Sequence, residues 1–192
     1  LQPYQGWADL VIAADGGVRC AALAGFTPAL YVGDSDSGGY ASAGMACISL
    51  PAEKDWTDLQ AAYEAALSRG AKELIFTGCT GGRQDHQLSA LGLLETAANH
   101  GVHGKILDPW NSIEFLTPGA YRVPKDGYTY FSLIPVDRSL EQVSICGAKY
   151  PLKNRDTFRG DSLTVSNEWK TDPVELSFAR GCCYLIRSNN PK

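Results

Sequence analysis

The sequence changes character at Pro118–Gly119, and this change limits the fold more than any other feature. Before it, short apolar runs alternate with segments in which apolar residues recur at helical spacing. Such alternation is typical of a mostly parallel sheet with helices on both faces. The runs expected to form strands are Leu10–Ala14, Ala29–Val32, Cys47–Leu50, Glu73–Thr77 and Lys105–Leu107.

Three helices are expected among these strands. The clearest has apolar residues at i, i+3, i+4, i+7 and i+8 from Leu59 and ends near Gly70. A short helix is expected between Gly17 and Gly25, and a longer one from about Asp85 to Asn99. In the longer helix the residues expected to face the sheet are Leu88, Leu91 and Leu94.

Helical periodicity disappears after Pro118–Gly119, where short β-type runs are separated by Gly, Pro, Asn and Asp. This pattern is typical of an antiparallel sandwich or barrel. The runs are Tyr128–Ile134, Val143–Cys146, Ser162–Val165, Val174–Phe178 and Cys183–Ile186. We therefore predict an α/β fold class, with a mostly parallel α/β domain over residues 1–118 and an antiparallel β-sandwich over residues 119–192.

Composition limits the function. The chain has 192 residues, 44% of them apolar, and a net charge of −4, which argues against a nucleic-acid binder that neutralises phosphates. No early apolar run is long enough to cross a membrane, and no secretory leader is visible, so we expect a cytoplasmic protein. The six cysteines form no CxxC pair and are expected to be buried, reduced thiols.

Six aspartates stand just after predicted strands of the first domain. The carboxyl ends of parallel strands share one sheet edge, where ligands bind, so these carboxylates are expected to meet in one crevice. They are Asp15, Asp34, Asp36, Asp55, Asp58 and Asp85.

A metal ion and a phosphate chain would relieve this crowding of negative charge. Oxygen ligands alone suit Mg²⁺ or Mn²⁺, and Mg²⁺ held by carboxylates usually carries substrate phosphates. Lys54 and Arg83 lie in the same loops and supply positive charge. Glycines in these loops let the backbone approach an anion; they are Gly16, Gly17, Gly33, Gly38, Gly39, Gly78, Gly81 and Gly82.

Each feature alone has a simpler interpretation. Asp55 or Asp85 would cap a following helix, and Asp34-Ser35-Asp36 would form a turn. His86 would either contact the site or lie on the surface. The order of the whole set along one edge favours the metal–phosphate site. The P-loop and Gly-x-Gly-x-x-Gly motifs are absent, which excludes a P-loop enzyme and argues against a dinucleotide site.

Six short motifs together resemble the thiamine pyrophosphokinase (thiamine diphosphokinase) family, over nearly the full chain. The resemblance implies an ATP-binding α/β domain, a thiamine-binding β-sandwich and a homodimer with thiamine sites between subunits. It also implies conversion of ATP and thiamine to AMP and thiamine diphosphate with Mg²⁺. The motifs are Ala14–Gly17, Gly33–Ser37, Lys54–Asp58, Gly78–His86, Gly147–Leu152, and Gly160 with Ser166–Asn167.

On this resemblance each candidate residue has an expected role. Asp34, Asp36, Asp55 and Asp58 would hold the metal and, with Arg83, form the catalytic set. Ser166 and Asn167 would hydrogen-bond the aminopyrimidine of thiamine, and Trp169 would stack on the substrate. The expected ATP ligands are Asp15, Gly16, Gly17, Lys54, Thr57, Gly81, Gly82, Arg83, Asp85 and His86.

Two other functions would use parts of the same residue set. A metal-dependent nucleotide-sugar transferase would use Asp34-Ser35-Asp36, but it gives the segments Lys54–Asp58 and Ser166–Asn167 no role. A non-catalytic thiamine or nucleotide sensor would not need the full set of carboxylates. An assay for AMP from ATP, Mg²⁺ and thiamine separates these alternatives.

Overall fold

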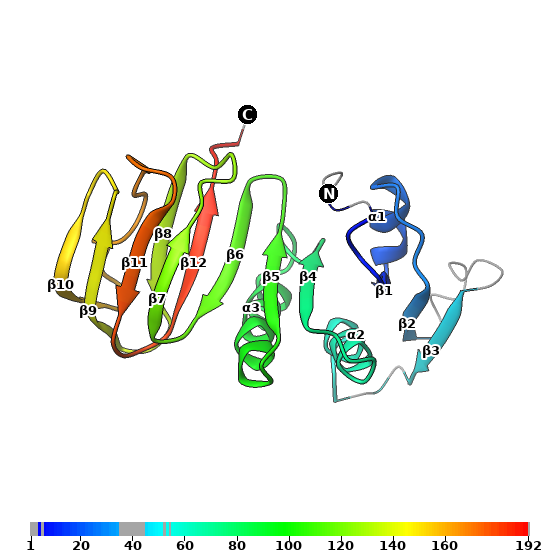
Figure 1. Ribbon diagram of the computed structural model, residues 1–192. Helices are drawn as coiled ribbons and strands as arrows, with labels where there is room; N and C mark the ends of the chain where they lie inside the picture. The colour runs from blue at the N-terminus through cyan, green and yellow to red at the C-terminus, as the bar shows by residue number, and fades with distance from the viewer. Residues whose placement is uncertain (1–3, 5, 35–44, 52, 54, 192) are drawn as a thin grey trace. The chain divides into compact units, whose positions relative to one another are not determined.

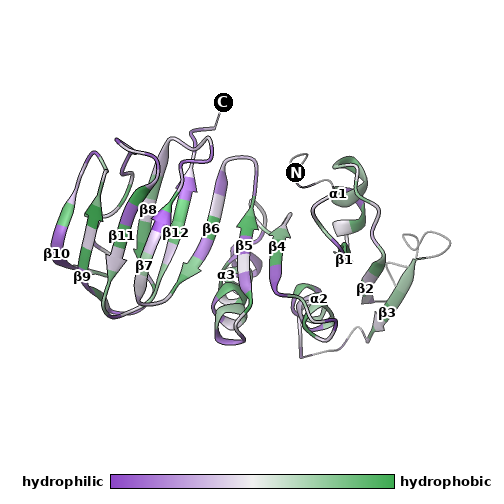
Figure 2. Ribbon diagram, in the orientation of Figure 1, coloured by the Kyte–Doolittle hydropathy of each residue, from purple (hydrophilic) through white to green (hydrophobic). Residues whose placement is uncertain are grey.

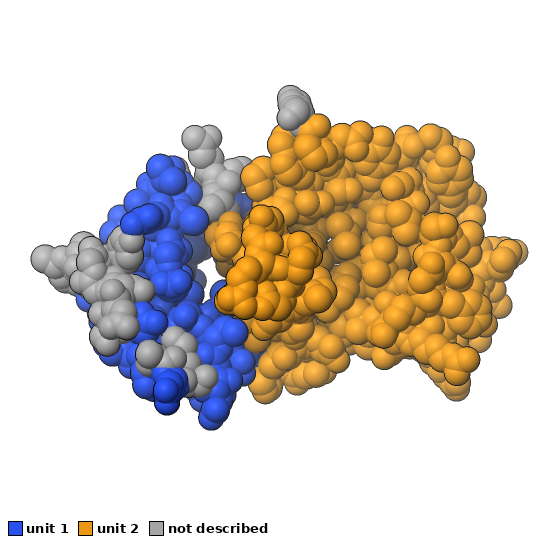
Figure 3. Space-filling view, turned by 180° about the vertical axis from the view of Figure 1, so that it is seen from behind, with its two compact units in different colours: residues 1–72 blue, residues 73–192 orange. Residues whose placement is uncertain are grey.

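A computed structural model describes residues 4, 6–34, 45–51, 53 and 55–191, and it divides into two compact units, residues 1–72 and 73–192 (Figure 3). Two predicted site residues, Asp36 and Lys54, lie outside the described residues.

Unit 1 is built on a parallel sheet with the strand order β1-β2-β3 (Figure 1). Its elements are β1 (Ile12–Ala14), α1 (Gly17–Leu23), β2 (Leu30–Asp34), β3 (Ala46–Leu50) and α2 (Asp58–Leu67). Helix α2 packs three alanines onto β2, and small side chains there let the helix lie close to the sheet. The buried cluster contains Leu30, Val32, Ala61, Ala62 and Ala65.

Unit 2 contains a five-stranded mixed sheet with the order β4-β5-β6-β12-β8. Only β4 and β5 are parallel; the other pairs are antiparallel. Helix α3 (Gln84–Asn99) contacts β5 and β6. The strands are β4 (Glu73–Thr77), β5 (His103–Leu107), β6 (Asn111–Leu116), β8 (Tyr130–Pro135) and β12 (Cys183–Ser188).

A second, antiparallel sheet in unit 2 has the order β10-β9-β11-β7. Its strands are β7 (Gly119–Val123), β9 (Ser139–Cys146), β10 (Leu152–Phe158) and β11 (Val174–Phe178). Residues alternate between buried and less buried along β11 and β12, and hydropathy changes along the same strands (Figure 2). Leu133 and Leu185 from the mixed sheet share one core with Val143 and Leu176 from this sheet, so the two sheets form a sandwich.

The predicted α/β fold class is confirmed: the structure contains a parallel sheet, a mixed sheet and an antiparallel sheet. Strands β6, β7 and β10 were not predicted. The expected strand Ser162–Val165 is wrong, because this segment forms turns and bends beside β8. Strands of the mixed sheet come from both sides of Pro118–Gly119, and the domain boundary placed there stays a prediction.

Two smaller expectations are corrected. Helix α3 buries Ala90, Leu93, Leu94 and Ala97, whereas Leu88 is 65% exposed. The six cysteines are free, but only Cys183 is buried. Within the described residues, no helix combines the length and the apolar character that a membrane crossing requires.

Candidate active site

Two predicted site aspartates end neighbouring parallel strands of unit 1. Asp15 directly follows β1, and Asp34 is the last residue of β2. The strands are in register with Ala14 opposite Val32, and the N–H of Asp15 donates to the Val32 carbonyl at 2.9 Å. The structure therefore places Asp15 and Asp34 at the same edge of the sheet, the edge at which α/β sheets bind ligands.

Gly33 precedes Asp34 because Tyr31 leaves no room for a side chain there. A Cβ atom on Gly33 would overlap the Tyr31 hydroxyl oxygen and would lie 2.7 Å from the Cζ atom of that ring. Tyr31 is itself buried, with 3% of its surface exposed. The glycine thus allows the tyrosine ring to pack along β2 toward the residue that carries the carboxylate.

The remaining candidates of unit 1 surround two helix starts. Gly16 is the N-cap of α1, and Gly17 is its first residue. Thr57 caps α2, where its hydroxyl accepts from the N–H of Gln60 at 3.2 Å. Asp58 lies in the first turn of α2. Because Thr57 caps α2, Asp55 is not the capping residue of this helix. Asp55 lies exposed in the bend before it.

In unit 2, the loop after β4 leads to an exposed ion pair at the start of α3. Arg83 donates from Nε to Oδ1 of Asp85 at 3.1 Å and from Nη2 to Oδ2 at 2.5 Å. The N–H of His86 also donates to Asp85, at 3.0 Å. Gly81 has a φ of 80°, a left-handed conformation that glycine adopts without strain. Gly82 follows Gly81 in the same loop. The hydrogen bonds above bring Arg83, Asp85 and His86 together at the start of α3.

This two-point contact fixes the charges of Arg83 and Asp85. The hydrogen bond with Asp85 raises the pKa of the guanidinium, and the hydrogen bond from Arg83 lowers the pKa of the carboxyl. Asp85 therefore stays ionised and orients the cation. The guanidinium remains exposed for an anionic ligand, since its side chain is 74% exposed.

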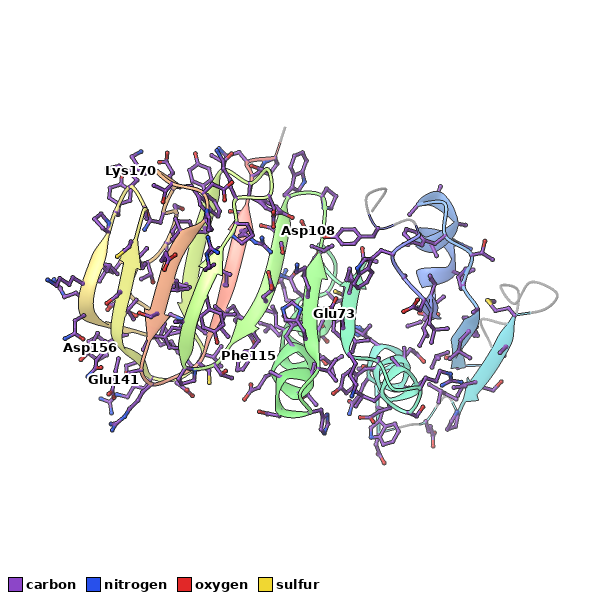
Figure 4. All side chains as sticks on the ribbon, in the orientation of Figure 1. Glu73, Asp108, Phe115, Glu141, Asp156 and Lys170 are labelled. Atoms are coloured by element: carbon purple, nitrogen blue, oxygen red, sulfur yellow. The ribbon has the colours of Figure 1, made fainter. Side chains whose placement is uncertain are left out.

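Asp108, which was not among the predicted site residues, stands directly after β5 beside the end of β4. Figure 4 labels Asp108 near these strand ends and Glu73 at the start of β4. Burial raises the pKa of the neighbouring Cys79 thiol to about 11, and the negative charge of Asp108 adds to this effect. Asp108 accepts from the N–H groups of Trp110 and Asn111 at 2.8 and 2.7 Å. The rule used for the other aspartates, an acidic residue directly after a strand, also identifies Asp108.

The donors at the edge of unit 1 have the right chemistry for a hard divalent cation, because they are carboxylate oxygens. In the described part of the chain, however, no three His, Cys, Asp or Glu side chains come together as a metal site. Asp36, a predicted ligand, is not among those residues. The described residues thus suit a divalent cation in the type of their ligand atoms and in the placement of Asp15 and Asp34 at one sheet edge.

Ser166 and Asn167 lie beside β8, the edge strand of the mixed sheet. Asn167 pairs with Phe131, and the N–H of Leu133 donates to the Thr164 carbonyl at 3.0 Å. Two residues, Val165 and Ser166, therefore stand opposite Ser132 alone, which is a β-bulge. Ser166 has a φ of 57°, and its N–H donates to the Ser132 hydroxyl at 2.9 Å.

The side chains of Asn167 and Trp169 are both engaged within the protein. Asn167 is 3% exposed and hydrogen-bonds the backbone of Tyr150. Trp169 donates from Nε1 to the Val123 carbonyl at 2.9 Å, and its ring packs on Phe131 with the centroids 4.8 Å apart. Their direct contact with thiamine stays a prediction, and this geometry gives both residues a structural task.

Two family models match the chain in succession. The model described as "Thiamin pyrophosphokinase, catalytic domain" matches residues 1–106, and "Thiamin pyrophosphokinase, vitamin B1 binding domain" matches residues 120–183. The thiamine pyrophosphokinase of Bacillus subtilis (strain 168) is 34% identical over an alignment of 188 residues, and this alignment covers 94% of this chain and 88% of that protein.

Solved structures agree with these matches. The crystal structure of the Bacillus subtilis thiamine pyrophosphokinase has a TM-score of 0.87 at 30% identity, covering 98% of this chain and 92% of that one. The crystal structure of the Geobacillus thermodenitrificans thiamin pyrophosphokinase has a TM-score of 0.86 at 31% identity, covering 100% and 93%. The chain therefore belongs to the thiamine pyrophosphokinase family.

Proposed function

We propose that this chain transfers a diphosphate group from ATP to thiamine, giving thiamine diphosphate and AMP. The observation that carries the proposal is the succession of the two family matches, catalytic over residues 1–106 and vitamin B1 binding over residues 120–183. Residues 1–118 would then bind ATP, and residues 119–192 would bind thiamine.

The reaction needs a positioned nucleophile and a stabilised phosphate chain. The hydroxyl oxygen of thiamine attacks the β-phosphorus of ATP, and the bond from that phosphorus to the oxygen shared with the α-phosphorus breaks, so AMP leaves. The hydroxyl proton passes to one carboxylate of Asp34, Asp36, Asp55 and Asp58. Lys54 and Arg83 neutralise phosphate charge, with Arg83 oriented by Asp85.

The same four aspartates would hold Mg²⁺, or Mn²⁺ in its place, since carboxylate oxygens suit both ions. When bound, the ion supplies positive charge at the phosphate oxygens. Asp15, Gly16, Gly17, Thr57, Gly81, Gly82 and His86 are the further residues that we assign to ATP.

We also infer a cytoplasmic homodimer with thiamine sites between its subunits. Residues 1–118 carry 13 acidic and 6 basic side chains, whereas residues 119–192 carry 8 acidic and 11 basic ones. Opposite net charges favour contact between the first part of one copy and the second part of another. Gel filtration with light scattering tests this assembly.

One assay tests the activity. The purified chain is incubated with ATP, Mg²⁺ and thiamine, and AMP and thiamine diphosphate are separated and quantified. The proposal requires equal amounts of the two products, and loss of both on addition of a chelator without unfolding. In a separate incubation with Mg²⁺ and a nucleotide sugar, hydrolysis of that sugar nucleotide would favour the transferase alternative. Thiamine binding without AMP formation would favour the sensor.

A further inference from the structure

The turn between β5 and β6 carries a tryptophan, Trp110, at the same sheet edge as the loop after β4. Strands β4 and β5 are parallel and end in register at Thr77 and Leu107, so the segments that follow them leave the sheet side by side. Asp108 begins the turn and is labelled in Figure 4. Its negative charge acts on the Cys79 thiol in the loop after β4, so the turn and this loop are close together.

Hydrogen bonds hold the backbone of Trp110 on both sides. Its N–H donates to Oδ1 of Asp108 at 2.8 Å, and the N–H of Asn111 donates to the same oxygen at 2.7 Å. The Trp110 carbonyl accepts from the N–H of Asn189, which directly follows β12, at 2.9 Å. The turn therefore has a fixed conformation, set by one carboxylate and by the end of a neighbouring strand.

The indole of Trp110 is not engaged in the same way as its backbone. The residue is partly exposed. In the part of the chain that the structure describes, its Nε1 has no hydrogen-bond partner and no other aromatic ring lies against it. Trp169, by contrast, donates from Nε1 to Val123 and packs on Phe131. Trp110 thus presents an aromatic face on a fixed turn, which suits stacking with a flat ligand.

The neighbouring loop indicates which flat ligand this is. It carries Gly81, Gly82 and Arg83, which the proposed function assigns to ATP, and adjacent strands are only about 5 Å apart. A nucleotide whose phosphates lie at this loop can therefore reach the turn after β5 with its base. The Asn111 amide donates to both oxygens of Asp108, at 3.0 and 3.1 Å, so it is already engaged within the turn. The turn thus offers a stacking surface rather than hydrogen bonds to a particular base.

We propose that Trp110 is a specificity-determining residue that stacks on the adenine of ATP. This inference rests on the proposed function and refines its ATP site. Stacking accepts any base with a π face, and its strength grows with the size of the ring system. The chain should therefore prefer purine to pyrimidine nucleoside triphosphates and should discriminate only weakly between ATP and GTP.

The first test compares three substitutions. Trp110→Ala removes the ring, Trp110→Phe keeps a smaller one, and Phe158→Ala is a control on another exposed aromatic residue of unit 2. We expect Trp110→Ala to raise the KM for ATP about 5- to 50-fold, with the KM for thiamine unchanged. Trp110→Phe should lose less, and the control should stay within about 2-fold of the parent chain. An unchanged KM for ATP in Trp110→Ala overturns the proposal.

Nucleotide preference separates stacking from a purely structural role of the turn. The ratio of kcat/KM for ATP to kcat/KM for CTP should fall in Trp110→Ala, because the larger ring system of adenine loses more stacking than cytosine does. Equal losses for ATP and CTP would mean that the substitution only disturbs the turn, and they overturn the stacking role. Circular dichroism and thermal melts confirm that each variant is folded.

Tryptophan fluorescence extends the test to binding without turnover. The probe is an ATP analogue in which a methylene group replaces the oxygen between the α- and β-phosphorus atoms. The analogue should quench the parent chain and should quench Trp110→Phe less, at concentrations that calorimetry shows to saturate both. Equal quenching overturns the contact between Trp110 and the base. A parent chain that shows Trp110-dependent quenching but forms no thiamine diphosphate contradicts the proposed function alone, whereas one that binds no nucleotide overturns both.

Discussion

Arg187 and Glu114 form a buried ion pair between β12 and β6, with Nη2 2.5 Å from Oε1. Arg187 also donates to Asp126 from Nη1, and the second oxygen of Glu114 lies 2.9 Å from Nε2 of His103. The side chains of Arg187 and Glu114 are only 5% and 12% exposed. The two buried charges are therefore compensated within one small network.

Replacing Glu114 with Gln should destabilise the protein by about 3 kcal/mol, because it removes the more buried of the two carboxylates that pair with the buried Arg187 charge. Urea unfolding at neutral pH measures the change. Glu175→Gln is the matched control, since Glu175 pairs with Arg122 at 3.7 Å on the surface. That substitution should cost less than about 1 kcal/mol. Equal losses in the two variants would contradict the importance of burial.

Stability should fall in acid because of the same carboxyl. Burial alone would raise the pKa of Glu114, but the hydrogen bond with His103 and the charges of Lys105 and Arg187 lower it from 4.5 to about 2. A folded pKa below the unfolded one adds stability above pH 4.5, and this is lost as the pH falls toward 2. The complete loss should be about 3 kcal/mol. The urea midpoint of the parent chain should therefore fall between pH 6 and pH 3, and this fall should be smaller in Glu114→Gln.

Gly33→Ala should destabilise the protein by about 2 kcal/mol, since the new methyl group would overlap the Tyr31 ring. Gly104→Ala offers a matched comparison in β5, where the nearest atom is Cδ2 of Leu94 at 3.1 Å. The end of a flexible side chain can move, so this variant should lose less. Thermal melts of both variants check the order, and a milder effect at Gly33 would contradict the packing argument.

Ser166→Gly should leave stability unchanged within about 1 kcal/mol, because glycine adopts a positive φ without strain but costs more chain entropy. Ser166→Val should destabilise the protein by about 1–2 kcal/mol, because a β-branched residue is strained at a positive φ. If the Ser166 hydroxyl binds thiamine, the glycine variant raises the thiamine KM while its melting temperature stays near the parent value. If the KM of Ser166→Gly for thiamine equals that of the parent chain, the role of Ser166 is only to shape the bulge.

Asp34→Asn should lower kcat on the order of 10²-fold or more while the fold is retained, because it removes one charge from the proposed metal site. Glu53→Gln is a control on an exposed carboxylate of the same unit. The measurement is initial-rate AMP release at saturating ATP and thiamine. Near-parental activity of Asp34→Asn would exclude its metal role.

Sequence periodicity predicted the elements that bury apolar residues at regular spacing. Helix α2 and the inner strands β2 and β11 are examples, since their burial follows their hydrophobic pattern. Strand β10 escaped prediction because it is an edge strand with the sequence Leu-Lys-Asn-Arg-Asp-Thr-Phe and buries only Thr157. Edge strands often carry charged side chains, so a search for apolar runs does not detect them.

Some features of the candidate site could likewise be predicted from the sequence, and others could not. The rule that ligands meet at strand ends places Asp15 and Asp34 together within unit 1. It does not reveal that the Trp169 ring turns inward, because that depends on the partner ring of Phe131 and the distant Val123 carbonyl. Long-range contacts of this kind have no local sequence signal.

Strand β12 lies in the mixed sheet between β6 and β8, although it comes last of the strands along the chain (Figure 1). During synthesis, β6 and β8 leave the ribosome well before residues 183–188 can join them. The nascent chain therefore presents two unpaired strand edges to its surroundings until that last strand arrives. A sheet completed in this way exposes strand edges for longer than one that grows strand by strand from one side.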